Sequence, residues 1–214
     1  YTEITMRKIF IFFGAILLLA GAGCVRPEEP NVRLPADIRG VSLSPKSFEA
    51  ADFTEFFRKA NEAGRFITWA GDWGELGKDN SGPRVVTELA VRYNYEPVIM
   101  VSHFDQSNQK FFRPFDSAAQ KEYQDSAVEF VKKYQPKYFG MGVEINILRE
   151  YSGKDYQDFV GFFNQVAEAI RIASPETKVF TAFQLERLRG LRGGLFGGAN
   201  DESLAEWNLL DDFT

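Results

Sequence analysis

Five apolar segments of strand length alternate with segments of helix length along this chain, and that alternation restricts the fold more than any other feature. The expected strands are residues 37–45, 65–73, 96–105, 137–148 and 177–186. The expected helices between and after them are residues 52–64, 83–93, 117–134, 156–174 and 203–210. Alternating strands and helices predict a parallel sheet, because each helix returns the chain to start the next strand in the same direction.

Several helix ends carry the residues that usually start or stop a helix. Asp52 is expected to cap the start of the first helix, and Gly64 to follow its end. Pro136 and Pro175 should stop the third and fourth helices, because proline cannot continue a helix.

A doubly wound sheet and a (β/α)8 TIM barrel both satisfy this alternation. No glycine-rich phosphate loop follows the first strand, so a dinucleotide-binding fold lacks its signature. Polar and aromatic side chains instead collect at the carboxyl ends of the strands, where a TIM barrel builds its active site. We therefore predict an α/β fold of the TIM-barrel type, with about the first five βα units present. The residues at these strand ends are Ser42, Ser44, Trp69, Asp72, Trp73, His103, Asp105, Glu144, Asn146, Gln184 and Glu186.

The fourth segment, KYFGMGVEINIL, places a glutamate and an asparagine in an otherwise apolar strand. Alternate residues of a strand point to opposite faces, so Phe139, Met141 and Val143 should face the surrounding helices. Glu144 and Asn146 should then point into the mouth of the barrel. A buried carboxylate is costly unless it is paired, solvated or used. Glu144 is either a functional carboxylate or a solvated group at a strand end.

The chain of 214 residues is shorter than the roughly 250 residues that a TIM barrel needs. It ends at LLDDFT, which resembles the approach to a sixth strand. This predicts a domain over residues 37–214 that is truncated at its carboxyl end.

The first 24 residues have the pattern of an export signal. A basic start, Met6-Arg7-Lys8, precedes a short apolar run and small residues that lead to Cys24. This end resembles the lipobox of bacterial lipoproteins, although Gly21 stands where leucine is usual; the alternative is ordinary secretory cleavage. The resemblance implies lipidation of Cys24 and an exported protein anchored to a bacterial membrane at the cell surface or in the periplasm. Residues 25–36 contain three prolines and should form a tether.

Charge and composition exclude several classes of function. The net charge of −5 does not suit a general nucleic-acid binder, which needs clustered Lys and Arg. The single histidine excludes a His-rich zinc site, and we predict neither a metal nor a cofactor. The glycine-rich stretch 189–198 has no Lys-Ser/Thr after it, so it should be a flexible loop rather than a phosphate cradle.

A family resemblance rests on four consecutive segments. They are the strand that ends in glutamate, the following helix, the segment SPETKVF and the strand that ends in FQLE. Over residues 37–214 the chain resembles the TIM-barrel glycoside hydrolases of the large retaining clan, in particular endo-galactanase-like and cellulase-like bacterial lipoproteins. The resemblance implies that Glu144 is the general acid/base at the end of the fourth strand. The nucleophile of that clan is a glutamate after the seventh strand, which would lie beyond the end of this chain. Val143 occupies the position where the clan has asparagine.

A glycoside hydrolase needs one carboxyl group to protonate the leaving oxygen and a second to attack. Trp69 and Trp73 are candidates to stack on sugar rings, although both are also compatible with the core. Glu186 is either a substrate ligand or an ion-pair partner of Arg187 or Arg189. The full set of expected substrate-binding residues is Trp69, Asp72, Trp73, His103, Asp105, Asn146, Gln184 and Glu186.

The leading hypothesis is therefore a retaining glycoside hydrolase that acts on a polysaccharide or oligosaccharide. The alternative is a carbohydrate-binding surface lipoprotein without catalysis on the same barrel, and a third is a gene fragment without independent activity.

Overall fold

The structure, a computed structural model, describes residues 38–192 and 201–213. The expected export signal with Cys24, the tether at 25–36 and most of the glycine-rich loop lie outside these residues. Within residues 38–192 and 201–213, no helix is long and apolar enough to cross a membrane.

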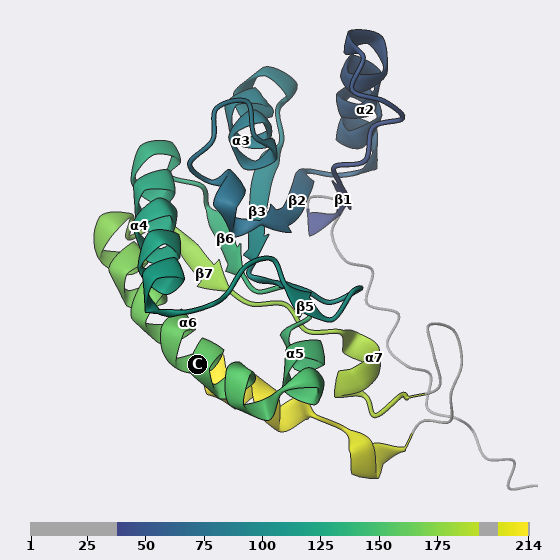
Figure 1. Ribbon diagram of the computed structural model, residues 1–214. Helices are drawn as coiled ribbons and strands as arrows, with labels where there is room; N and C mark the ends of the chain where they lie inside the picture. Colours follow the sequence, from purple (N-terminus) through teal and green to yellow (C-terminus); the bar gives the residue numbers. More distant parts are fainter. Residues whose placement is uncertain (1–37, 193–200, 214) are drawn as a thin grey trace, which may run out of the picture. The chain divides into compact units, whose positions relative to one another are not determined.

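All five expected strands are present and pair in parallel, in the order in which they occur along the chain (Figure 1). The helix after each of the first four strands joins it to the next, which confirms the parallel α/β fold that the alternation predicts. The strands are β1 Gly40–Ser42, β2 Phe66–Asp72, β3 Glu96–Ser102, β6 Tyr138–Met141 and β7 Lys178–Phe180. The connecting helices are α2 Ala50–Ala63, α3 Gly82–Tyr93, α4 Ser117–Tyr134 and α6 Gly153–Ala173.

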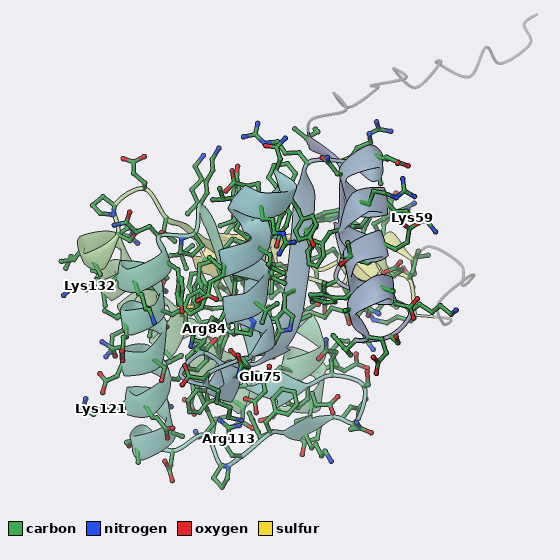
Figure 2. The ribbon with its side chains drawn as sticks, turned by 90° about the horizontal axis from the view of Figure 1, so that it is seen from above. Lys59, Glu75, Arg84, Arg113, Lys121 and Lys132 are labelled. Carbon is green, nitrogen blue, oxygen red and sulfur yellow. The ribbon has the colours of Figure 1, made fainter. Side chains whose placement is uncertain are left out.

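One face of the sheet is apolar and covered by these four helices. The register sets Trp69 opposite Ile99, Ile99 opposite Phe139, and Phe139 opposite Val179, so one row crosses four strands. Ile99 and Phe139 are fully buried in the same core as Phe159 of α6. Figure 1 shows α2, α3, α4 and α6 following one another along this side. Lys59 of α2, and Lys121 and Lys132 of α4, are exposed on the outer surfaces of their helices (Figure 2).

The opposite face of the sheet is only partly covered. Phe66, Val98, Met100 and Phe180 are half-buried there, while Ala70 is exposed. The rings of Phe66 on β2 and Tyr138 on β6 are in edge contact, with centroids 5.8 Å apart. Because β3 lies between these strands, their backbones are about 10 Å apart. The two rings therefore lean toward each other across β3 on this face.

Local signals account for most helix ends. Gly64 ends α2 as expected, and its N–H donates to the carbonyl of Ala60. The expected cap at Asp52 is wrong by three positions, because Glu49 occupies the cap position and Asp52 lies in the first turn. Asp116 caps α4 by accepting hydrogen bonds from the N–H groups of Ala118 and Ala119, both 3.0 Å long.

The largest difference from the expected fold is in the fourth strand. β6 ends at Met141, and α5 begins at Ile145 and runs to Tyr151. Gly142 and Glu144 have φ angles of +80° and +50°, which break the extended backbone. The alternation expected for Val143, Glu144 and Asn146 is therefore wrong, whereas Phe139 and Met141 do face the helices.

Two other segments also differ. The expected strand at 177–186 is shorter, and its end forms the short helix α7, Leu185–Leu188. The expected helix at 203–210 consists of two 3-10 segments, η3 Glu202–Leu204 and η4 Trp207–Phe213. A short hairpin of β4 Phe104–Asp105 and β5 Lys110–Phe111, which the sequence did not suggest, follows β3.

Two Gly→Ala substitutions should change stability in opposite directions. Gly161 lies inside α6 with no atom within 4 Å of an added Cβ, so Gly161→Ala should stabilise the protein by up to about 1 kcal/mol. A Cβ on Gly142 would lie 2.8 Å from Cζ of Phe159 on a backbone with positive φ. Gly142→Ala should therefore destabilise the fold by about 2 kcal/mol or more. Urea unfolding measures both, and equal effects would contradict the turn at Gly142.

Candidate functional site

Glu144 lies where β6 gives way to α5, at the carboxyl end of the parallel sheet. Its φ of 50° is in the left-handed region, which non-glycine residues adopt only at an energetic cost. Hydrogen bonds on both sides hold this geometry: the N–H of Ile145 donates to the carbonyl of Ala182 over 2.9 Å, and Ile147 donates to the carbonyl of Glu144 over 2.9 Å. The chain thus presents a half-buried carboxyl group on a turn that its neighbours impose.

Asn146 ties this turn to the loop that follows β7. Its side-chain Nδ2 donates to the carbonyl of Gln184 over 3.1 Å, and its Oδ1 accepts from the N–H of Gln184 over 2.9 Å. Asn146 is fully buried. The structure therefore uses the amide of Asn146, expected as a substrate ligand, inside the protein. We name this pair of hydrogen bonds the Asn146 clamp.

Glu186 and Arg187 on α7 act on Glu144 electrostatically. Partial burial raises the pKa of Glu144, the nearby Glu186 carboxylate raises it further, and the Arg187 guanidinium opposes the shift. Arg187 forms an ion pair with Glu150 and donates from Nε to Oε1 of Gln184 over 2.8 Å. Among the residues that the structure describes, Glu186 thus forms no ion pair with Arg187 or Arg189, the alternative to a role as substrate ligand, and Arg187 pairs with Glu150 instead.

A second ion-pair group lies beside these residues. Oε1 of Glu206 accepts from Arg149 at 3.0 Å and contacts Arg192 at 3.3 Å. The N–H of Glu206 donates to the carbonyl of Leu188 over 3.1 Å, which attaches residues 201–213 to α7. Sequence reasoning missed these arginines, although Arg149-Glu150 and Glu186-Arg187 are adjacent opposite charges soon after strand ends.

The two tryptophans expected as sugar platforms are in the core. Trp73 is 1% exposed; its indole stacks on Tyr123 with centroids 5.1 Å apart and is covered by the Arg113 guanidinium at 4.4 Å. Trp69 is buried in the apolar row that faces the helices. Of the two readings that the sequence allowed, the structure agrees with the core: both side chains point toward the helical layer, not toward the strand-end surface.

Asp72 and Asp105 organise their own loops. Asp72 forms an ion pair with Arg113 and accepts a 2.9 Å hydrogen bond from the N–H of Gly74. The Arg113 guanidinium lies against the backbone of Gly74, the residue before Glu75; Figure 2 labels Arg113 and Glu75. Asp105 accepts from the backbone N–H groups of residues 107 and 108 and from the side chain of Asn108, at 3.0, 3.1 and 2.7 Å. Neither carboxylate is brought to Glu144 by these contacts.

His103 is an interior residue rather than a sugar ligand. It is 1% exposed, and its ring stacks on Phe159 at 4.5 Å and packs against Phe115 at 4.3 Å. Neither ring nitrogen has a hydrogen-bond partner among the residues that the structure describes. Burial lowers the pKa of His103 to about 3, so the ring is neutral at ordinary pH.

The site centred on Glu144 is identified by its charged side chains rather than by a cavity. An open groove of about 740 Å³ lies elsewhere, between β1 and α2, and its walls include Ser42, Ser44 and Phe56. Over residues 38–192 and 201–213, no group of three or more His, Cys, Asp or Glu side chains could hold a metal ion. Of the expected site residues, the structure brings Asn146, Gln184 and Glu186 to Glu144.

The buried histidine should make stability depend on pH. Because the folded pKa of His103 is below the unfolded value of 6.5, the unfolded state binds more protons as the pH falls. The wild type should lose about 2 kcal/mol between pH 7 and pH 5 through this group, since one pH unit corresponds to about 1.4 kcal/mol. His103→Phe keeps the ring but cannot titrate, so its urea midpoint should fall less. Equal losses in both proteins would contradict a buried neutral imidazole.

The Asn146 clamp gives a second prediction. Asn146→Asp keeps the acceptor for the N–H of Gln184 but sets a carboxylate oxygen against the carbonyl of Gln184, which should cost about 2–3 kcal/mol at pH 7. Because that cost falls on the charged form, the folded pKa of the new carboxyl group should lie above its ordinary value of about 4, so protonation should restore a donor and recover part of the loss as the pH falls toward about 4. Asn164→Asp on the exposed side of α6 is the matched control and should change little. A difference between the two variants of less than a few tenths of a kcal/mol would argue against the clamp.

Models of known protein families and curated protein sequences give no match to this chain.

Proposed function

We propose that this chain carries the acid/base half of a glycoside hydrolase site, with Glu144 as the proton donor. The observation that carries the proposal is the environment of Glu144: a half-buried carboxyl group at the carboxyl end of a parallel strand, with its pKa raised by burial and by Glu186. A general acid must hold its proton near the working pH, and a raised carboxyl pKa serves that purpose.

We further infer that the sheet is part of a (β/α)8 barrel. The sequential order of the five parallel strands, the helices on one face and the Phe66–Tyr138 contact on the other face all support this. The groove between β1 and α2 is where a further βα unit would pack against the open edge of β1. A closed barrel needs three strands in addition to the five of the described sheet.

The reaction would proceed in two steps. The carboxyl proton of Glu144 passes to the glycosidic oxygen while the bond from that oxygen to the anomeric carbon breaks and a second carboxylate bonds to that carbon. Glu144, now a carboxylate, then takes a proton from a water molecule whose oxygen displaces the second carboxylate. The resemblance assigns that second carboxylate to a strand after the five described here.

Two exposed aromatic residues near this site are better placed for sugar stacking than Trp69 and Trp73. Tyr151 ends the helix that starts after Glu144, and its ring is 52% exposed. Trp207 follows Glu206, which contacts Arg149 of the same helix, and is 49% exposed. Aromatic faces that remain accessible suit the apolar faces of sugar rings.

A carbohydrate-binding protein without catalysis is the second candidate. Val143 favours it, because the resembled hydrolases have asparagine before the acid/base and a valine side chain cannot hydrogen-bond a sugar. In that case Tyr151 and Trp207 would bind sugar while Glu144 transferred no proton.

Glu144→Gln tests the assignment, because it keeps the shape of the side chain and removes its proton. Hydrolysis of oligosaccharides with poor leaving groups should fall by roughly 10²–10⁴-fold, while binding persists in calorimetry. Substrates with an activated leaving group need little protonation and should lose less in the first step. Glu122→Gln on the exposed side of α4 is the control and should leave turnover unchanged. If Glu144→Gln hydrolysed a substrate with a poor leaving group as fast as the wild type, Glu144 would not be the acid. If the wild type bound sugar without hydrolysing it, the carbohydrate-binding protein without catalysis would be favoured.

We also propose that residues 1–24 direct export and that Cys24 is lipidated, on the strength of the basic start, the apolar run and the small residues before the cysteine. Labelling bacteria that express the chain with a radioactive fatty acid should mark the wild type and not Cys24→Ser. Equal labelling of both proteins would contradict lipidation at this residue.

A further inference from the structure

Glu144 and Glu186 lie on the two adjacent segments that follow β6 and β7: Glu144 precedes α5, and Glu186 lies in α7. β6 and β7 pair in parallel, with Gly140 opposite Phe180, and each strand is followed by a turn into a short helix. Glu144 stands two residues before Asn146, and Glu186 stands two residues after Gln184. The Asn146 clamp joins these inner residues through both polar atoms of one amide. The clamp therefore fixes the two loops, and with them the two glutamates, relative to each other.

The charges around the pair are mostly satisfied by other partners. On α5 and α7, Glu150 and Arg187 form an ion pair with each other. In residues 201–213, Glu206 forms ion pairs with both Arg149 and Arg192. Among the residues that the structure describes, no ion pair includes Glu144 or Glu186. The charged groups that face Glu144 are then the carboxylate of Glu186 and, with opposite sign, the guanidinium of Arg187.

Two neighbouring carboxylates do not ionise independently, even where a cation such as Arg187 offsets part of their repulsion. As the pH rises, the carboxyl group whose charged form is less well solvated keeps its proton longer. Burial is the largest influence on the pKa of Glu144, and it favours the protonated form there.

We propose that Glu186 is a positioning residue whose negative charge keeps the proton on Glu144, with the Asn146 clamp setting the distance between the two carboxyl groups. This role rests on the proposed function of Glu144 as the acid. In the first step the proton leaves Glu144 for the glycosidic oxygen. In the second step the charge of Glu186 makes the Glu144 carboxylate a better acceptor for the proton of the attacking water. Glu186 itself exchanges no proton with the substrate.

The coupling can be measured without any substrate. In carbon-13 NMR titrations of the full chain, with Glu144→Gln used to assign the Glu144 carboxyl signal, Glu186→Gln should lower the pKa of Glu144 by about 0.5–1 unit. Glu186→Asp keeps the charge and should restore most of the shift. Glu176→Gln removes the same charge from an exposed loop and should change nothing. An unchanged pKa of Glu144 in folded Glu186→Gln would overturn the proposal.

The pH dependence of hydrolysis separates this inference from the proposed function. The basic limb of the pH profile of kcat/KM reports the loss of the proton from the acid of the free enzyme, so in Glu186→Gln it should move to lower pH by the same amount as the NMR value. A Glu144-dependent hydrolysis whose basic limb does not move would overturn the role of Glu186 and leave the acid assignment intact. A shifted NMR titration in a chain that hydrolyses no glycoside would support the carboxylate pair and refute the proposed function.

Discussion

One face of the sheet is apolar and has to be removed from water. Its central row consists of residues that lie opposite one another on neighbouring strands: Trp69, Ile99, Phe139 and Val179. An antiparallel hairpin could leave its other face in solvent, but a parallel sheet requires a crossover between each pair of strands. Four helices supply these crossovers and the cover at the same time. All the carboxyl ends of the strands consequently meet at one edge, and the loops that carry Glu144 and Glu186 have no other place to lie.

The sequence predicted this framework well because strands and helices were distinguished by length, periodicity and proline positions. It predicted the site less well, because left-handed residues leave no periodic signal. Glu144 adopts φ 50° after a glycine at +80°, and these two torsions convert an expected strand end into a turn and a helix. Asn146, which was expected to line the barrel, is consequently fully buried and forms the clamp.

The aromatic residues at the strand ends were misleading for a different reason. A tryptophan after a strand can point toward the open edge or back toward the helices, and the choice depends on what it meets. Trp73 meets Tyr123 of α4 on a nearly parallel plane and the guanidinium of Arg113. His103 meets three phenylalanine rings, among them Phe159 of α6. Tyr123, Arg113 and Phe159 come from distant parts of the chain, so no local pattern identifies them.

The sheet is widest in its middle and narrow at both margins. β2 and β3 each contain seven residues, whereas β1 and β7, which end the described sheet, contain three each. An unpaired strand edge invites pairing with another chain, and the tendency grows with the length of exposed backbone. Three residues offer few N–H and C=O groups in one line, so each margin is a poor template for the growth of aggregates. The short margins of the described sheet thus limit edge-to-edge pairing between copies of this chain.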